Sequence, residues 1–279
     1  SPDSVQVLTD SATWALLHEV WRAGQVPAPS LDAVTTKSVP ALRAFLQGED
    51  LIVEGRFTEA EEAFARAIAA DSTFWWAYRR YAYARGWNLK LVDSATVATY
   101  RTHRAELPDR ERLLIEAWMG AGDTSWTAYF ANLRRITERY PDYWPGWFQL
   151  GDQLVHAGPL LGGTDEDAIA ALQRTLALNP RLTPAWQHLQ WVAGERDPSL
   201  AAAALDSAIR LGYGTAQRAE QGFDHTRLLM EYYRTGSLNR RLFDSVADEI
   251  VAARTDPIAA FHPYWFSQVD PIAQNDLNR

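Results

Sequence analysis

Residues 41–74, ALRAFLQGEDLIVEGRFTEAEEAFARAIAADSTF, decide the fold. They carry small residues and one aromatic at the spacing G-x6-G-x4-A-x3-F-x2-A, which begins at Gly48 and ends at Ala67. Small residues allow two antiparallel helices to cross closely, and Phe64 fills the space between them. The stretch therefore predicts a hairpin of two helices.

The ends of these two helices are also marked in the sequence. The first is predicted over residues 42–54, and Gly55 ends it in a left-handed conformation. Thr58 and Glu61 have the spacing of a capping box that starts the second helix. Residues 59–70 are rich in Ala, Glu and Arg, which favour helix.

Two sets of landmarks show that the hairpin recurs along the chain. Aromatic residues that open a helix lie at Tyr78, Trp147 and Trp186. Residues that end the preceding helix lie at Ser72, Pro141 and Pro180. In both sets the intervals are 69 and 39 residues. These intervals indicate a repeat of about 34 residues, with a Gly- and Pro-rich insertion over residues 156–163.

Residues 41–211 resemble the tetratricopeptide repeats (TPR) of bacterial signalling proteins. More narrowly, they resemble the C-terminal repeat regions of bacterial serine/threonine protein kinases, through residues 35–49 (TTKSVPALRAFLQGE), residues 107–114 (LPDRERLL) and the tract 139–141 (RYP) followed by Trp147. The resemblance implies an all-α fold, a TPR-like α-solenoid in which antiparallel helix pairs form a right-handed superhelix, with helical additions at both ends. The sequence holds no kinase signature of its own, neither a Gly-rich phosphate loop nor His-Arg-Asp nor Asp-Phe-Gly.

The predicted organisation has four parts. We expect an N-terminal helix and Pro-rich linker over residues 1–40, and about five repeats over 41–213. Capping helices over 214–255 follow, because the end of a repeat array needs a polar outer face. The last part, 256–279, is an aromatic C-terminal tail. Since the chain begins Ser-Pro and not with Met, we expect it to be a piece of a longer protein.

Composition excludes several classes of function. The net charge is −8 and the sequence has no basic stripe, which disfavours binding to nucleic acid or to anionic membrane surfaces. The absence of cysteine excludes disulfides, thiolate catalysis and Cys-based metal sites. No apolar run approaches the length of a membrane-spanning helix, so no direct membrane insertion is expected. A cysteine-free chain suits either side of a membrane, and no compartment is predicted.

A peptide-binding groove is the candidate site. In the architecture that the resemblance implies, the first helix of each repeat lines a concave groove, and aromatic and Arg side chains there are typical anchors for a protein or peptide. The predicted lining residues are Trp76, Arg79, Tyr83, Trp87, Phe148, Asp152, His156, Gln187 and Trp191. The alternative for the aromatic members is core packing. We expect core packing for Trp147 and Trp186, which occupy the aromatic position of the repeat itself.

Other polar clusters are interpreted as structural. The six histidines share no H-x3-H or H-E-x-x-H spacing, so neither a metal site nor a cofactor is predicted. Residues 165–167 (DED) follow a predicted cap, Thr164, and complement the positive end of a helix. The pairs Glu61/Glu62 and Asp109/Glu111 are interpreted as helix-surface acids. Because no catalytic grouping stands out, the chain is not predicted to be an enzyme.

The sequence thus predicts a scaffold for a protein or peptide partner, as a regulatory or sensing part of a bacterial signalling protein. One alternative is a structural protein that assembles head to tail through its aromatic tail, with Phe261, Tyr264, Trp265 and Phe266 as the connecting residues. Another is an enzyme or small-molecule binder in which residues 156–164 act as a lid.

Overall fold

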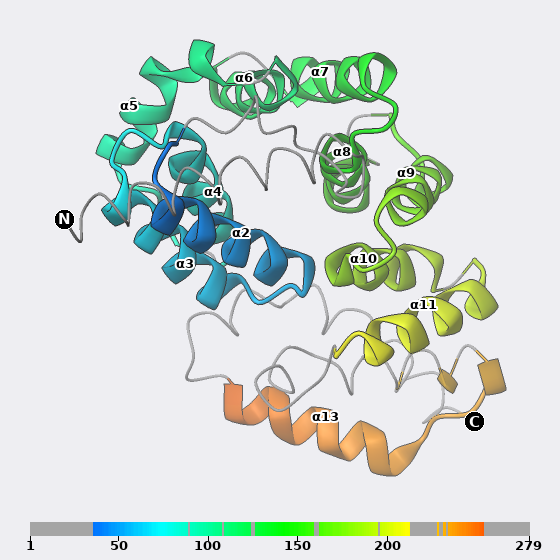
Figure 1. Cartoon of the computed structure of the whole chain (residues 1–279). Helices are drawn as coiled ribbons and strands as arrows, with labels where there is room; N and C mark the ends of the chain where they lie inside the picture. Colours follow the sequence, from blue (N-terminus) through cyan, green and yellow to red (C-terminus); the bar gives the residue numbers. More distant parts are fainter. Residues whose placement is uncertain are drawn as a thin grey trace. The chain divides into compact units, whose positions relative to one another are not determined.

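The computed structural model describes residues 36–88, 90–107, 109–123, 126–158, 162–194, 196–212, 228, 231–232 and 234–253 (Figure 1). Within these residues the chain forms eleven α-helices, one 3-10 helix and no strand, so the predicted all-α class is confirmed. The chain divides into two compact units, Ser1–Trp147 and Phe148–Arg279, and each is described by itself.

The first unit contains α2 (Val39–Val53), α3 (Phe57–Ala70), α4 (Trp75–Trp87), α5 (Ser94–Thr102), η2 (Arg104–Glu106), α6 (Asp109–Asp123) and α7 (Trp126–Arg139). Helix α8 (Trp144–Ala157) begins in the first unit and continues into the second. The second unit also contains α9 (Asp165–Leu178), α10 (Thr183–Ala193), α11 (Pro198–Arg210) and α13 (Arg240–Ala253). Neighbours along the chain pack together, as α2 does with α3, α3 with α4, α6 with α7, α9 with α10 and α10 with α11.

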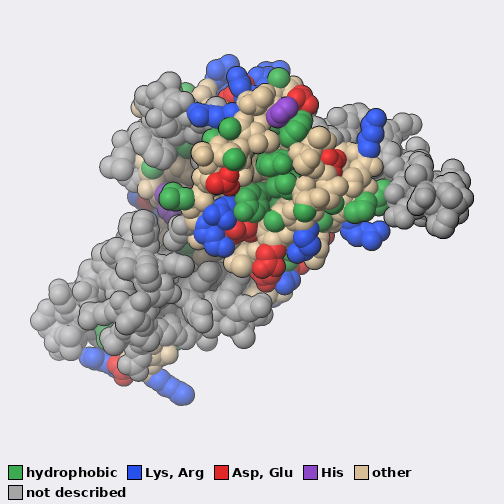
Figure 2. Space-filling model, turned by 90° about the vertical axis from the view of Figure 1, so that its left-hand side faces the viewer, with side chains coloured by type: hydrophobic (Ala, Val, Ile, Leu, Met, Phe, Trp, Pro, Cys, Tyr) green, Lys and Arg blue, Asp and Glu red, His purple; other side chains and the backbone are tan. Residues whose placement is uncertain are grey.

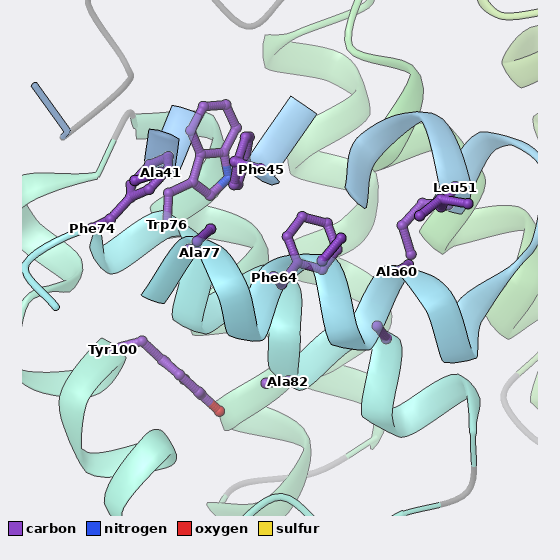
Figure 3. Packing of buried hydrophobic residues seen from close by; sticks show 14 of the residues in the cluster. Ala41, Phe45, Leu51, Ala60, Phe64, Phe74, Trp76, Ala77, Ala82 and Tyr100 are labelled. Atoms are coloured by element: carbon purple, nitrogen blue, oxygen red, sulfur yellow. The ribbon is translucent and has the colours of Figure 1, made fainter. Parts of the chain in front are cut away.

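The close crossing of α2 and α3 is confirmed. A Cβ atom built on Gly48 would lie 2.5 Å from Cε1 of Phe64, so any larger residue there would force the ring to move. Ala60 and Ala67 of α3 are fully buried. Phe64 packs edge-on against Phe45, with ring centroids 5.5 Å apart, in the apolar core that α2, α3 and α4 share (Figure 3).

The second unit repeats this packing between α8 and α9. A Cβ atom on Gly151 would lie 2.9 Å from Cδ2 of Leu172, as the predicted repeat register requires. Gly151 of α8 thus has the role that Gly48 has in α2, and Leu172 has the role of Phe64. The same small-against-large contact holds a pair of consecutive helices in each unit.

One turn geometry occurs three times at the predicted landmarks. Each turn connects one helix to the next, and the residue just before the next helix donates its backbone N–H to the carbonyl three residues earlier. These hydrogen bonds run from Phe74 to Asp71 (3.2 Å), from Tyr143 to Tyr140 (3.0 Å) and from Leu182 to Asn179 (3.2 Å). The opening aromatic then donates to the carbonyl of the helix-ending residue: Tyr78 to Ser72 (3.2 Å), Trp147 to Pro141 (3.1 Å) and Trp186 to Pro180 (2.8 Å). The two sets of landmarks are therefore joined by one repeated hydrogen bond.

The ends of α2 agree only in part with the prediction. Gly55 has φ +69° and ends the helix as expected. The helix begins at Val39, three residues earlier than predicted, because the Ser38 hydroxyl accepts a hydrogen bond from the N–H of Ala41 and caps it. Pro40 in the first turn loses nothing there, since that position has no intrahelical N–H bond to make.

The predicted capping box of α3 is wrong. The helix begins at Phe57, so Thr58 already lies inside its first turn and no side chain caps the helix. The Thr58 hydroxyl instead donates to Oδ1 of Asn88, 3.3 Å away. Glu61 is buried and contacts side chains that follow α3 in the sequence.

The cap of α9 is confirmed. The Thr164 hydroxyl accepts from the N–H of Asp167, and the Asp167 carboxylate accepts from the N–H of Thr164, both at 3.1 Å. The helix begins at Asp165, so three acidic residues lie in its first turn, where the helix dipole favours them.

The two ends of the predicted organisation fall largely beyond the described part of the chain. Residues 1–35 and the tail 256–279, with all four predicted connecting aromatics, lie outside the described residues. Of the predicted capping region, the structure describes Leu228, short pieces near residue 232 and helix α13, whose Leu242 and Phe243 pack near Leu228. None of the described helices combines the length and the apolarity that crossing a bilayer requires.

Candidate functional site

The first predicted groove residue, Trp76, lies in the core. Its side chain is 1% exposed and its ring centroid is 4.9 Å from that of Phe45 on α2 (Figure 3). The position predicted for it, on an open surface, is therefore wrong. The reason is that α4 packs against α3 on one side while its first turn also reaches α2, so the side chain at this position is enclosed.

The other predicted residues of α4 are partly accessible. Tyr83 and Trp87 are half-buried, and their rings meet edge to face with centroids 6.3 Å apart. Trp87 also stacks on Phe57 of α3, at 4.5 Å and an interplanar angle of 5°. The Arg79 guanidinium lies 5.5 Å from the centre of the Tyr83 ring. The Tyr83 and Trp87 rings form one partly open surface on α4, and the Arg79 side chain, only 11% exposed, lies beside it.

A network of buried charges lies beneath that surface. The Arg80 guanidinium holds the Glu49 carboxylate of α2 through two hydrogen bonds, one of them from Nη2 to Oε2 at 2.8 Å. Burial by itself lowers the pKa of Arg80, but the charge of Glu49 outweighs it and raises the pKa. Burial also raises the pKa of Glu49, against the opposing effect of Arg80. The paired hydrogen bonds favour an ionised Glu49, because both of its oxygens accept from the guanidinium.

The network continues to α6 and α8. Glu111 of α6 is 4% exposed and lies 3.8 Å from Nε of Arg79. The hydroxyl of Tyr143, just before α8, donates to the other oxygen of Glu111. Burial and the Glu111 charge raise the pKa of Tyr143 well above its usual value. The interpretation of Glu111 as a helix-surface acid is therefore wrong.

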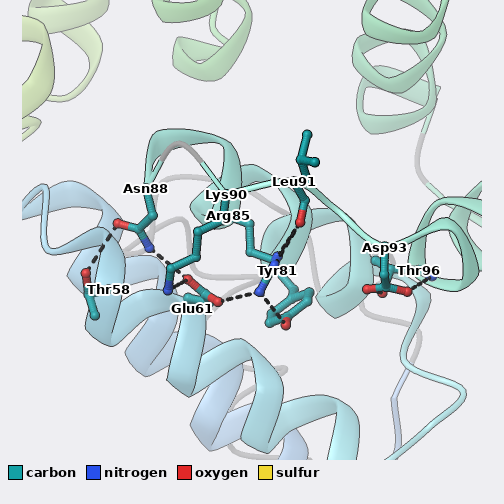
Figure 4. Close-up of polar contacts among 9 residues, drawn as sticks. All are labelled: Thr58, Glu61, Tyr81, Arg85, Asn88, Lys90, Leu91, Asp93 and Thr96. Atoms are coloured by element: carbon teal, nitrogen blue, oxygen red, sulfur yellow. Dashed lines mark hydrogen bonds and ion pairs between the residues drawn. The ribbon is translucent and has the colours of Figure 1, made fainter. Parts of the chain in front are cut away.

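Glu61 is the centre of a second polar cluster (Figure 4). Its carboxylate accepts from Nη1 of Arg85 at 2.8 Å, from Nδ2 of Asn88 at 2.8 Å and from Nζ of Lys90 at 2.9 Å. Burial alone would raise the pKa of Glu61, but the hydrogen bonds and positive charges of these partners outweigh it and lower the pKa. Arg85 also donates to the carbonyl of Leu91, at 2.7 Å from Nη2. Glu61 therefore joins α3 to the end of α4 and the loop after it, and it is not the surface acid predicted.

Charges of both signs share the face of the molecule near α3 and α5. Figure 2 shows this side, on which hydrophobic side chains lie at the surface between Arg or Lys and Asp or Glu. The loop residue Leu91 is 92% exposed. A surface on which acidic and basic groups alternate does not concentrate positive charge in the manner of a phosphate-binding face.

In the second unit the predicted groove residues differ in exposure. Phe148 is 2% exposed, so its predicted surface position is wrong, and its ring meets the imidazole of His188 edge to face at 5.9 Å. Gln187 and Trp191 of α10 are half-buried. The Trp191 ring lies 4.9 Å from the His188 ring. Asp152 is 7% exposed and faces α10.

The structure brings Asp152, His156 and His188 together. Oδ1 of Asp152 lies 3.0 Å from Nε2 of His188 and 3.6 Å from Nε2 of His156, and the two imidazole nitrogens are 3.3 Å apart. The three donor atoms all lie within 4.8 Å of one another. His188 is fully buried, whereas the side chain of His156 is 55% exposed. The cluster is thus closed on one side and open to solvent on the other.

Hydrogen bonds around the cluster orient its members. Nδ1 of His188 donates to the carbonyl of Pro184 at 2.7 Å, because a carbonyl can only accept. Oδ2 of Asp152 accepts from Nε2 of Gln153 at 2.8 Å. Burial raises the pKa of Asp152, but the two neighbouring histidines and Gln153 outweigh it and lower the pKa. Desolvation lowers the pKa of His156, although the Asp152 charge opposes it, and a neutral imidazole follows at pH 7.

The sequence predicts Asp152 and His156 in the groove, but no local pattern connects them with His188. Asp152 and His156 are one helical turn apart, which is a detectable spacing for two side chains on one face. His188 is 32 residues from His156 and lies on another helix. A search for histidine pairs within one helix therefore misses the cluster, whereas a search at the repeat distance would find it.

Comparisons with known proteins identify no family. No protein-family model matches the chain, and no curated protein sequence matches it.

Proposed function

We propose that the chain is a TPR-like helical-repeat scaffold that binds a protein or peptide partner. The observation that carries the proposal is the turn that occurs three times with the same backbone and side-chain hydrogen bonds. Repeats of one helix pair present equivalent helix faces at regular intervals, which suits the recognition of an extended or helical segment.

The accessible side chains support this kind of binding. In the first unit α4 offers the half-buried rings of Tyr83 and Trp87 beside Arg79. In the second unit α10 offers Gln187 and Trp191. Tyr, Trp and Arg are the residues that most often contribute strongly to binding at protein interfaces.

The context follows from the resemblance to kinase-associated repeat regions. On that basis the chain is a regulatory or sensing part of a bacterial signalling protein and has no catalytic activity of its own. The alternative is self-assembly, in which the partner is a second copy of the chain and the aromatic tail connects the copies.

The first experiment is light scattering over a wide range of protein concentration. A scaffold for another protein gives a mass that does not change with concentration. Growth into large open assemblies would instead support self-assembly, and deletion of residues 256–279 would then abolish it if the tail connects the copies.

The second experiment selects binders from a displayed peptide library and measures their affinity for the whole chain. We expect Tyr83→Ala and Gln187→Ala to weaken binding by about tenfold or more if the peptide lies on the face that contains the substituted residue. Leu91→Ala is the control, because that side chain is 92% exposed and lies outside both surfaces. If both variants keep their helicity and every selected peptide binds them as tightly as the parent chain, the proposed groove is wrong.

A further inference from the structure

The arrangement of Asp152, His156 and His188 brings two imidazole nitrogens and one carboxylate oxygen together. Since Nδ1 of His188 donates its proton to the Pro184 carbonyl, Nε2 of the neutral ring carries a lone pair. That nitrogen lies 3.0 Å from Oδ1 of Asp152, which also carries lone pairs. A cation between the two atoms can accept both lone pairs at this distance. A cation at that point would also lie close to Nε2 of His156, which is 3.3 Å from Nε2 of His188.

The distances between the donors fit a common cation. First-row metal ions bind imidazole nitrogen and carboxylate oxygen at about 2.0–2.2 Å. Two such ligands at an angle of about 90–110° around the ion lie roughly 3.0–3.5 Å apart. The three observed separations are 3.0, 3.3 and 3.6 Å. The three donor atoms are therefore close enough together to share one ion.

The surroundings also match those of metal sites. A metal-binding histidine usually donates its second ring nitrogen to a carbonyl or carboxylate, as His188 does to Pro184. A metal-binding carboxylate is itself hydrogen-bonded, as Asp152 is through Gln153. Phe148 and Trp191 form aromatic contacts with His188 on the buried side. The exposed side chain of His156 leaves a path from solvent, and coordination positions there remain open to water.

We infer that Asp152, His156 and His188 bind one divalent first-row transition-metal ion, of the Zn²⁺ or Fe²⁺ class, through two imidazole nitrogens and one carboxylate oxygen. Imidazole ligands favour this class over Mg²⁺ and Ca²⁺, which prefer oxygen. Because Asp152 and His156 lie on α8 and His188 lies on α10, the ion links two helices that are not consecutive. The inference does not depend on a peptide-binding function.

The test is titration of the whole chain, freed of metal by a chelator and exchanged into buffer, with ZnCl₂, CoCl₂ and MgCl₂. We expect one tight site for Zn²⁺ and Co²⁺ that depends on the cluster, and no comparable site for Mg²⁺. Bound Co²⁺ should give a visible ligand-field spectrum, and Zn²⁺ should raise the Tm of the chain. His156→Ala and Asp152→Asn should each weaken Zn²⁺ binding by at least about tenfold. His156 is exposed and Asn matches Asp in shape, so both variants should keep the fold.

The matched control is His103→Ala. His103 contacts one carboxylate, Glu106, at 2.6 Å and lies in the first unit, so its loss should leave Zn²⁺ binding unchanged. Zn²⁺ binding that His156→Ala and Asp152→Asn leave intact would belong to other side chains and would overturn the inference. So would the absence of any site tighter than about millimolar, which would make the cluster a His–Asp contact without metal.

Discussion

Single residues at helix crossings determine how closely the helices approach. Gly48 faces the buried Phe64 ring, and a Cβ atom there would lie 2.5–2.8 Å from three of its ring atoms. A Cβ atom built on Gly86, near the end of α4, would meet no neighbouring atom within 4 Å. Two glycines in helices thus have opposite environments, one enclosed and one open.

Substitution by alanine should separate these two glycines. Gly48→Ala should lower the free energy of unfolding by about 1–3 kcal/mol, because the fully buried Phe64 has no free space to move into. Gly86→Ala should raise it by up to about 1 kcal/mol through helix propensity. Urea unfolding of the two variants measures both changes. Equal effects would mean that the α2–α3 crossing is looser than described.

Trp76, at the start of α4, lies in the core and not on the binding surface. Trp76→Ala should lower the free energy of unfolding by about 3–5 kcal/mol, since it removes a fully buried aromatic side chain from the core. Trp76→Phe should cost less, and Leu91→Ala, at a 92% exposed position, should cost nearly nothing. Thermal or urea unfolding provides the comparison. A Trp76→Ala variant as stable as the parent would return this residue to the binding surface.

At the scale of the elements, two threonines near helix N-termini have different roles. The Thr164 hydroxyl caps α9, whereas Thr58 lies inside the first turn of α3 and caps nothing. Thr164→Ala should therefore lower the free energy of unfolding by about 1 kcal/mol. Thr58→Ala removes one exposed side-chain hydrogen bond to Asn88 and should have a smaller effect. The reverse order in urea unfolding would restore the capping box at residue 58.

The contact between α3 and the end of α4 should depend on pH. The pKa of Glu61 is lowered in the folded chain, so the ionised form stabilises the fold above the unfolded-state pKa of about 4.3. This contribution should disappear as the pH falls through the lowered pKa. Glu61→Gln should therefore cost about 1–3 kcal/mol near pH 7, and progressively less as the pH falls below about 4. Glu62→Gln, at the exposed neighbouring position, is the control. The measurement is the free energy of unfolding of each variant as a function of pH. If both variants showed the same pH dependence, the prediction would be wrong.

At the scale of the whole molecule, polar contacts recur at nearly one repeat length. Arg80 binds Glu49, 31 residues earlier. His188 meets His156 at a separation of 32 residues. Arg196 binds Asp165, again 31 residues earlier. Each such contact joins two segments that lie about one predicted repeat length apart in the sequence, within one unit.

Much of the fold could be predicted from the sequence because it depends on local rules. The φ angle of Gly55, the cap at Thr164 and the close approach of Gly48 and Phe64 follow from the steric properties of those residues at short spacings. The landmarks 69 and 39 residues apart predicted the three equivalent turns, because each turn is built from residues close together in the sequence.

The candidate site depended on contacts that no local pattern contains. Whether Trp76, Glu61 and Glu111 are buried is decided by helices that pack over them, not by their own spacing. Asp152 meets His188 because α8 and α10 bring two separate segments together, and hydrogen bonds from Gln153 and to Pro184 then orient them. The sequence by itself determined the helices and the three equivalent turns, since these follow from short-range sterics. Only the tertiary structure decided which polar groups are removed from water and converge, because desolvation and convergence depend on distant parts of the chain.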